Sequence, residues 1–453
     1  MKLKELKIKN FRCFEQYYIS FAAQSTILIG KNGTGKTTLL NAIKASLSFI
    51  FSKYQTKNES FKLLGTNAYL SLVTLKETDA FFNIDKKLYE YPIDIHAIAN
   101  FEQTIIDWAI VKNTSNSKLL DTKYREAFMS FIKQYNQDLQ NSPLPVLAYF
   151  SDSYPHTKTN IGSYAKGVLE SGNIPRAFGY YQWDADTSCA EIWQNRYVSQ
   201  YSKVNDFKRT EEDTKAERDE IEFIDNRIKI FTEQLEGNYD FINPEFKVNK
   251  IVMDRPLKNS NSVSIKFIFE NRREIFFEHL PQGYNRLLSI VFDIAYRSYI
   301  LNGLHEPQGI VIIDELELHL HPTLQQEVLQ RFQKTFPQIQ FIISTHSPLI
   351  ISNQKADGET SKIIKLENDG DNYTNQDIDN IYGIDYSTNL SEIMEVAPRS
   401  TTIDKYINAY LFLYGKNKQE EADKMLKKLE QYVGGEIPSV LKEEINQLKK
   451  SYK

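Results

Sequence analysis

A glycine-rich octapeptide between an apolar run and a helical run constrains the fold of this chain more than any other feature. Residues 26–29 are largely apolar, as in a strand covered on both faces, and Gly30 to Gly35 interrupt them. From Lys36 onward, leucine and isoleucine recur at helical spacing. A strand, a glycine-rich loop and a helix in this order predict an α/β fold whose loop wraps a phosphate group.

Each part of this loop has an expected role in holding ATP. Glycines let successive backbone N–H groups turn inward around the phosphates, and the helix N-terminus adds a partial positive charge. Lys36 is expected to reach the β and γ phosphates, and the Thr37 hydroxyl is expected to ligate Mg²⁺. The residues expected to contact the nucleotide are Gly30, Asn32, Gly33, Gly35, Lys36, Thr37 and Thr38.

A second apolar run ends in two adjacent carboxylates. Residues 310–313 predict a buried strand, and Asp314 and Glu315 follow it directly. Ligands of such sheets bind at the carboxyl ends of the strands, so the two acids are expected beside the loop. We expect Asp314 to hold Mg²⁺, usually through water, and Glu315 to polarise the attacking water as general base. ATP and Mg²⁺ are therefore the expected cofactors.

Three further motifs lie before and after these acids in the sequence. Residues 280–284 read LPQGY and precede an apolar helical run, residues 317–322 read ELHLHP, and residues 344–348 read STHSP. Together with the loop and the acids, this order resembles ABC-type ATPases of the RecF, SMC and OLD branch. The resemblance implies an ATPase head, a mixed sheet with flanking helices, to which this chain adds a helical insert and a C-terminal helical domain.

The resemblance also implies a head-to-tail dimer that sandwiches ATP. In this branch the signature helix of one subunit points its N-terminus at the γ-phosphate held by the other, which assigns Gly283 to the partner's nucleotide. His346 corresponds to the switch histidine that senses the γ-phosphate. The segment from Asn10 to Arg12 resembles the branch's N-terminal strand, whose Asn and Arg approach the nucleotide.

The signature motif departs from the pattern of the branch. The usual sequence is Leu-Ser-Gly-Gly, and its serine donates to the γ-phosphate, whereas Pro281 and Gln282 occupy the second and third places here. A helix N-terminus still binds an anion through its backbone. We therefore expect ATP to bind well and to be hydrolysed slowly.

Other polar clusters favour ordinary structure over separate chemistry. His319 and His321 suggest a metal site, but they lie in the D-loop and lack a third ligand at suitable spacing. Residues 369–371 read Asp-Gly-Asp and predict a hairpin turn, because the other acidic motifs of a TOPRIM nuclease do not follow. We expect no nuclease within the chain.

Motif positions divide the chain into four predicted parts. Residues 1–95 and 246–374 form the two parts of the ATPase lobe, 96–245 form a mainly helical insert, and 375–453 form a helical interaction domain. Within the insert, apolar residues recur every three or four positions between 206 and 237, which predicts an amphipathic helix. The last part predicts antiparallel helices at 402–415 and 417–433.

Composition places the protein in water rather than in a membrane. Its 453 residues contain no apolar stretch long enough to span a bilayer, and the N-terminus lacks the apolar core of a signal peptide. Two cysteines far apart suit a reducing cytoplasm, and the net charge of −4 gives no overall attraction to nucleic acid. We expect a cytoplasmic protein with no membrane partner.

The signature and the tail carry a narrower resemblance. The LPQGY motif, residues 381–385 (IYGID) and residues 389–394 (NLSEIM) resemble the PtuA ATPases of Septu anti-phage defence, which also occur beside some retrons. The resemblance covers most of the chain and is loose from 95 to 245. It implies a homodimer or higher oligomer that holds a separate HNH nuclease (PtuB-like) in check until infection.

Three other functions stay open. A related defence ATPase would work with a TOPRIM nuclease, and only the identity of the partner would distinguish it. A RecF-type repair ATPase would bind DNA in an ATP-dependent way, although the sequence shows no strong basic stripe. A transporter subunit would dock on a membrane protein. Contact with nucleic acid, directly or through the partner, is compatible with the first two.

Overall fold

The protein is described here by a computed structural model. It describes residues 1–51, 72–101, 104–133, 142–153, 163–171, 174–184, 189–206, 209–233, 235, 246–255, 263–370, 372–379, 381–397 and 399–451. The chain divides into two compact units, Met1–Gly383 and Ile384–Lys453. None of the described helices combines the length and the apolar character needed to cross a bilayer.

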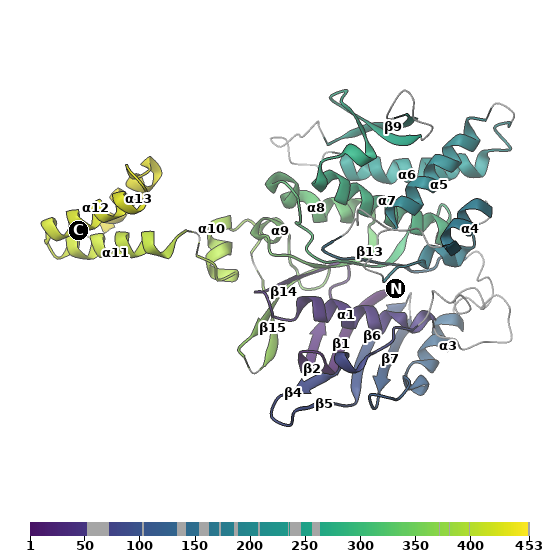
Figure 1. The fold of residues 1–453 in the computed structure, drawn as a ribbon, viewed down its shortest axis with the longest axis horizontal. Helices are drawn as coiled ribbons and strands as arrows, with labels where there is room; N and C mark the ends of the chain where they lie inside the picture. Colours follow the sequence, from purple (N-terminus) through teal and green to yellow (C-terminus); the bar gives the residue numbers. More distant parts are fainter. Residues whose placement is uncertain are drawn as a thin grey trace. The chain divides into compact units, whose positions relative to one another are not determined.

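A six-stranded mixed sheet, counted over the described residues, forms the frame of the first unit (Figure 1). Its strand order is β15 (Tyr373–Asp377), β14 (Ser361–Asn368), β3 (Ser25–Ile29), β13 (Gln338–Ser344), β12 (Gln308–Ile313) and β8 (Val146–Phe150). All pairs are parallel except β14 with β15. Every residue of β3 is buried, as predicted for a central strand, because both faces are covered.

A four-stranded antiparallel sheet packs beneath the first helix. Its order is β2 (Phe14–Ser20), β1 (Lys2–Phe11), β6 (Ile93–Phe101) and β7 (Thr104–Lys112). Helix α1 (Lys36–Leu47) contacts β1, β6 and β7, and its apolar face joins theirs in one core. The alternation of buried and half-buried residues along β6 is the pattern of a strand with one covered face.

Helices cover the far side of the six-stranded sheet. They are α4 (Ser163–Ser171), α5 (Ala190–Val204), α6 (Lys215–Thr232), α7 (Gln282–Asn302), α8 (Pro322–Thr335) and α9 (Pro348–Ser352). The predicted amphipathic helix is α6, which buries Phe223, Ile224, Ile228 and Phe231 and contacts α5, α7 and α8. Its apolar face is therefore used within the unit.

Shorter elements complete the first unit. They are η1 (Ser48–Phe51), η3 (Glu77–Asp79), β4 (Phe81–Asn83), β5 (Leu88–Glu90), η4 (Asp121–Lys123), α3 (Arg125–Lys133), η5 (Arg176–Tyr180), β9 (Val248–Asp254), β10 (Ser264–Phe269), β11 (Glu274–Phe276) and η6 (Phe277–His279). Asp369 and Gly370 lie between the antiparallel strands β14 and β15, which confirms the predicted hairpin, while residue 371 lies outside the described residues.

Residues 96–245 are less separate from the ATPase lobe than predicted. Strands β6 and β7 pair with β1, and β8 extends the six-stranded sheet beside β12. The prediction of a mainly helical insert missed these strands because their partners lie far away in the sequence. Within this range, residues 102–103, 134–141, 154–162, 172–173, 185–188, 207–208, 234 and 236–245 lie outside the described residues.

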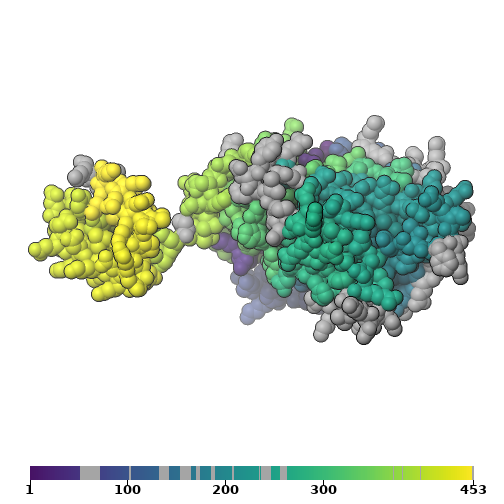
Figure 2. All heavy atoms as spheres, turned by 90° about the horizontal axis from the view of Figure 1, so that it is seen from above, coloured from purple at the N-terminus to yellow at the C-terminus, as the bar shows by residue number. Residues whose placement is uncertain are grey.

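The second unit is a small helical body (Figures 1 and 2). It contains α10 (Tyr386–Thr388), η7 (Asn389–Ile393), α11 (Thr401–Gly415), α12 (Gln419–Tyr432) and α13 (Ser439–Ser451). Helices α11 and α12 form the predicted pair, joined by a short turn. Its buried core consists of Ile407, Tyr410, Leu411, Ala422, Leu429, Ile437 and Ile445. Strand β15 spans the predicted boundary at 374/375, and the compact unit begins later, at Ile384.

Candidate nucleotide-binding site

The glycine-rich loop connects β3 to α1, as its sequence predicts. Gly35 has φ 90°, and a Cβ at this position would lie 2.7 Å from Cζ of Phe14. At Gly30, with φ 149°, a Cβ would lie 2.5 Å from the Leu366 carbonyl oxygen. Glycine is therefore required at both positions by conformation and by space. Asn32 and Gly33 lie exposed on the outer turn of the loop.

Lys36 lies in the loop with its ammonium group turned toward the loop backbone. Its Nζ donates to the carbonyl oxygens of Gly30 (2.7 Å) and Lys31 (3.0 Å), and the residue is 8% exposed. Burial lowers the pKa of Lys36, while the negative charges of Asp314 and Glu315 act against that effect. A cation in this position, beside N-terminal amides of α1, suits a polyphosphate.

Asp314 lies at the end of β12, where it meets the start of α1. Thr37 Oγ1 donates to Asp314 Oδ2 across 3.3 Å, and Ser344 Oγ at the end of β13 donates to Asp314 Oδ1. A hydroxyl and a carboxylate oxygen at this spacing fit Mg²⁺, which takes few protein ligands and completes its shell with water and phosphate. Thr37 and Asp314 are the residues that would hold the ion. Thr38 follows on the same helix, half-buried.

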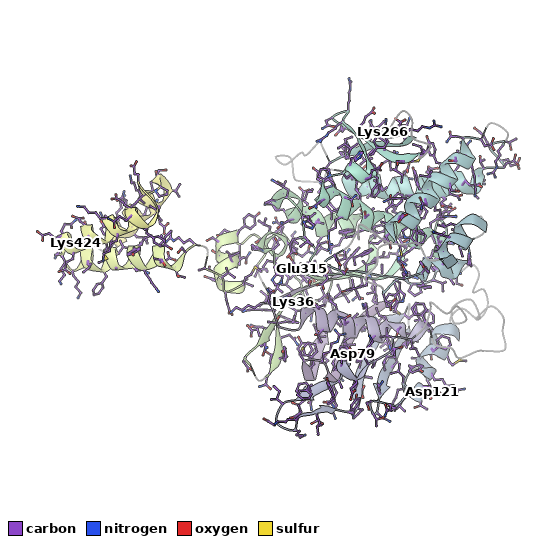
Figure 3. All side chains as sticks on the ribbon, viewed as in Figure 1. Lys36, Asp79, Asp121, Lys266, Glu315 and Lys424 are labelled. Carbon is purple, nitrogen blue, oxygen red and sulfur yellow. The ribbon has the colours of Figure 1, made fainter. Side chains whose placement is uncertain are left out.

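Glu315 has a left-handed backbone conformation and a raised side-chain pKa. Its φ is 48°, and its N–H donates to Ser344 Oγ at 2.8 Å. Burial, followed by the charges of Asp314 and Glu317, raises the pKa of Glu315. A carboxylate with a raised pKa is a stronger proton acceptor, which suits a general base. Figure 3 shows Glu315 and Lys36 close to each other.

His346 follows β13 and lies near the same charges. Its backbone N–H donates to Glu317 Oε1 (2.6 Å), and Thr345 Oγ1 donates to Glu317 Oε2 (2.7 Å). Burial, and then the charge of Lys36, lowers the pKa of the His346 imidazole, against the opposing charge of Glu317. The ring is therefore neutral at neutral pH and can either accept or donate a hydrogen bond.

Asn10 and Arg12 flank the loop without a described bond to it. Asn10, with φ 52°, donates from Nδ2 to the Pro92 carbonyl oxygen at 3.0 Å. Arg12, with φ 51°, pairs with Asp79 (Nε to Oδ1, 3.0 Å). The next residue, Cys13, lies beside Gly35, where a Cβ would be 3.3 Å from Sγ. The turn thus borders the site, and the nucleotide contacts of Asn10 and Arg12 stay predictions.

The signature segment begins α7 and packs on its own D-loop. A Cβ at Gly283 would lie 2.5 Å from the His319 carbonyl oxygen. Pro281 is the residue that caps the helix, and its side chain makes no capping hydrogen bond. His321 Nδ1 accepts from Thr323 N (3.4 Å) at the start of α8, which gives this histidine a capping role. The predicted contact of Gly283 with a partner's nucleotide stays a prediction.

Comparison with protein families agrees with this geometry. The family described as AAA ATPase domain matches residues 1–162 and 179–351. This chain belongs to that family.

Individual relatives of this ATPase-domain protein come from retrons and from Septu. The retron Vc95 probable ATPase of Vibrio cholerae serotype O1 biovar El Tor is 27% identical over 424 residues, 82% of this chain and 74% of that protein. The retron Ec83 probable ATPase of Escherichia coli is 24% identical over 77% of this chain and 69% of that protein. Septu protein PtuA of Bacillus thuringiensis is 30% identical over 32% of this chain and 38% of that protein.

Among solved structures, the SMC head domain from Thermotoga maritima aligns with 84% of this chain and 100% of its own. The TM-score is 0.42 and the sequence identity is 12%.

Sequence reasoning about this ATPase domain missed one buried arginine. Arg286, 1% exposed in α7, donates to the carbonyl oxygens of Ser151 (3.2 Å), Asp152 (3.0 Å), Asp314 (2.9 Å) and Glu315 (3.2 Å). It ties the second turn of the signature helix to the residues that directly follow β8 and β12. The sequence signal that could have indicated it is a charged residue, Arg286, directly before an apolar helical run.

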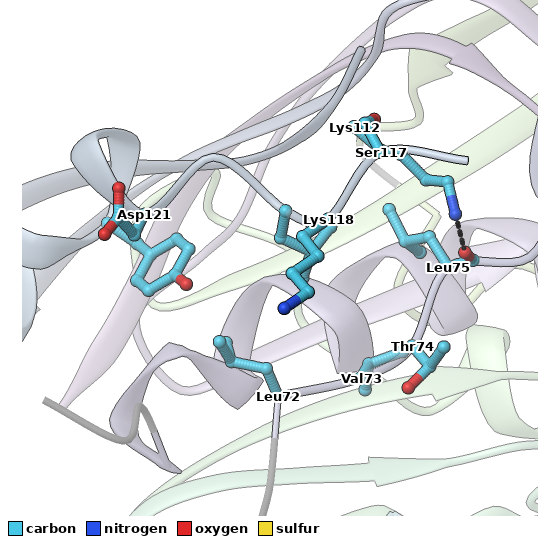
Figure 4. A pocket seen from close by; sticks show the side chains of 10 residues that line it. Leu72, Val73, Thr74, Leu75, Lys112, Ser117, Lys118 and Asp121 are labelled. Atoms are coloured by element: carbon cyan, nitrogen blue, oxygen red, sulfur yellow. Dashed lines mark hydrogen bonds between the residues drawn. The ribbon is translucent and has the colours of Figure 1, made fainter. Parts of the chain in front are cut away.

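Two hollows of about 480 Å³ each lie on the surface of the ATPase unit. The first is bordered by Lys112, which donates to the Leu75 carbonyl oxygen, and by Lys118 and Asp121 (Figure 4). The second lies along α6 and includes Arg227, which pairs with Glu306. Neither hollow contains a residue predicted for the nucleotide site.

Proposed function

We propose that this ATPase binds Mg²⁺ and ATP between two heads and acts as the sensing and regulatory subunit of an anti-phage defence complex. In that complex it controls a separate HNH nuclease. The observation that carries the ATP part is the 3.3 Å contact between Thr37 and Asp314, which come from segments 277 residues apart. The retron and Septu relatives support the defence part.

The residues of the site divide the work of hydrolysis. The loop amides and Lys36 bind the phosphates, and Glu315 takes the proton of the attacking water. Mg²⁺, when held by Thr37 and Asp314, neutralises charge on the phosphates. His346 contacts the γ-phosphate side, and Gly283 of a second head closes the site. The absence of a serine at position 281 makes turnover slow.

A substitution at Glu315 tests the ATP-sandwich mechanism. Glu315→Gln keeps the side-chain shape and removes the base, so kcat should fall by about 100-fold or more. The variant should accumulate as an ATP-bound dimer, measured by sedimentation with and without ATP. Lys36→Ala is the matched control and should show no ATP-dependent dimer. A Glu315→Gln protein that stays monomeric in saturating ATP would contradict the sandwich.

Purification with neighbouring gene products tests the choice of partner. The tagged protein should retain an HNH protein, identified by mass spectrometry, and the tail unit should be needed for retention. A co-purified TOPRIM nuclease would instead assign the protein to another defence system. A protein that comes alone and binds DNA only with ATP would favour RecF-type repair.

A further inference from the structure

Glu317 bridges two loops that follow the neighbouring parallel strands β12 and β13. It lies in the segment 315–321 between β12 and α8, whereas Thr345 and His346 follow β13. Both of its carboxylate oxygens are used: Oε1 accepts the His346 backbone N–H at 2.6 Å, and Oε2 accepts the Thr345 hydroxyl at 2.7 Å. One side chain therefore fixes the backbone and a side chain of residues 345–347, the switch loop, at the same time.

The other hydrogen bonds of the switch loop anchor its two ends, and Glu317 holds the residue between them. Thr345 N donates to the Leu28 carbonyl oxygen (3.0 Å), which anchors the start of the loop to β3. Ser347 N donates to Thr345 Oγ1 (3.0 Å), and Ser347 Oγ donates to Gln325 Oε1 (2.6 Å), which anchors its end. The N–H of His346, between these anchors, is bound by Glu317.

The charge of Glu317 also reaches the reacting groups. It raises the pKa of His346 against burial and the charge of Lys36. It also raises the pKa of Glu315, after burial and the charge of Asp314. Position and charge can be separated experimentally, because an amide of the same shape removes the charge while its oxygen still accepts from His346 N–H and its NH₂ group can donate to Thr345 Oγ1.

We propose that Glu317 is a positioning residue that holds His346 against the γ-phosphate and transmits movement of the segment 315–321 to it. The role rests on the proposed hydrolysis of ATP. Glu317 acts through His346 and takes no proton from the reacting water. Because the segment 315–321 also contacts Gly283 through His319, a shift of the signature helix reaches His346 through Glu317.

Three variants separate the hydrogen bonds from the charge. Glu317→Ala removes both bonds. Thr345→Val removes the bond from the hydroxyl to Glu317 and also the one from Ser347 N to Thr345 Oγ1. Glu317→Gln keeps an oxygen that accepts from His346 N–H, and its NH₂ group can donate to Thr345 Oγ1. Glu359→Gln, at an exposed carboxylate in a surface turn, is the matched control. Each variant is first compared with the wild type by circular dichroism and thermal unfolding, so that misfolded protein is not scored.

The kinetic test uses kcat together with the Kd for ATP. Glu317→Ala should lower kcat by about 30-fold or more and change the Kd by less than about 3-fold, because binding rests on the loop. Thr345→Val should lie between that variant and the wild type. Glu317→Gln should keep kcat within about 3-fold, because it can still hold the His346 backbone. Wild-type kcat in Glu317→Ala, or Glu317→Gln as slow as Glu317→Ala, would overturn the proposal.

A second measurement does not depend on hydrolysis. In ¹⁵N-histidine-labelled protein, the His346 ring signal, assigned with a His346→Gln variant, should titrate at lower pH in Glu317→Gln than in the wild type. Its chemical shift should also change in Glu317→Ala. An unchanged shift and titration in both variants would overturn the proposal, whereas a wild type without ATPase activity would overturn the proposed function alone.

Discussion

Carboxylates in the two units of this protein lie in opposite surroundings. Glu315, at the edge of the six-stranded sheet, has a raised pKa because it is half-buried and lies near the charges of Asp314 and Glu317. Glu444, in the tail, has a lowered pKa because it accepts two hydrogen bonds from Arg399, of 2.6 and 2.8 Å. The first arrangement costs stability and supports chemistry, while the second supports stability alone.

The two units also differ in what they bury. Around the nucleotide site, Arg286 and Asp314 are almost fully buried and held by strand ends. The tail has a small core and leaves Phe412 61% and Val440 76% exposed, although the first unit also leaves single apolar side chains such as Ile84 (80%) in water. A rigid edge suits the binding of a small anion, and an exposed apolar surface suits contact with another protein.

The largest expected effect is the loss of ATP binding in Lys36→Ala. The phosphates lose the cation that the loop backbone holds, so the Kd for ATP should rise by about 100-fold or more. Isothermal titration calorimetry measures this. Lys44→Ala, on the same helix but bonded to the Asp184 carbonyl oxygen, should bind ATP normally. If Lys36→Ala still bound ATP with nanomolar affinity, Lys36 would not be the residue that holds the phosphates.

Removal of residues 384–453 should separate the two units functionally. The Kd for ATP should stay within about 3-fold of the full-length value, because the site lies in the first unit, and the affinity for the partner should fall by about 10-fold or more. Surface plasmon resonance with the co-purified partner measures the latter. Unchanged partner affinity and unchanged assembly would show that the tail is passive.

Pro281→Ser should speed hydrolysis by about 3- to 10-fold, because a hydroxyl at the helix N-terminus adds a donor for the γ-phosphate. The measurement is kcat in single- and multiple-turnover assays. Pro281→Ala controls for the loss of the proline ring and should leave kcat unchanged. If serine has no more effect than alanine, the atypical signature does not limit the rate.

The smallest expected effect is a gain in thermal stability of nucleotide-free Glu315→Gln. Because the folded-state pKa of Glu315 is raised above its ordinary 4.5, its contribution to stability is present below that pH and is lost as pH rises through the raised pKa. At pH 7 the variant should therefore unfold about 1 to 2 °C above the wild type, with a smaller gain at pH 4.5. A lower Tm at pH 7 would contradict the cause assigned to the raised pKa.

Sequence reasoning predicted the elements that local patterns encode. The loop at Lys36 and the acids after 313 each combine a strand pattern with unusual residues, and the structure brings Thr37 to Asp314 as expected. The hydrogen bond from Ser344 to Asp314 was not foreseen, although its motif had been noted. A serine at a strand end has many ordinary roles, and only the parallel pairing of β12 with β13 gives it this one.

Residues 96–245 were harder to predict for a related reason. Strand β8 is a five-residue apolar run, and its length does not tell a buried strand from a helix segment. Its place at the sheet edge comes from pairing with residues 309–313, more than 150 positions later. Likewise, Arg286 appears as an ordinary charge until its four carbonyl partners are brought together from two strand ends.

The central position of β3 has a consequence for synthesis of the chain. Residues 25–29 leave the ribosome early, but the strands that flank them, β13 and β14, span 338–368. Until those residues emerge, the strand that bears the phosphate loop has both backbone edges unpaired, a state that invites aggregation. A nascent or prematurely terminated chain that ends before β14 should therefore need chaperone protection.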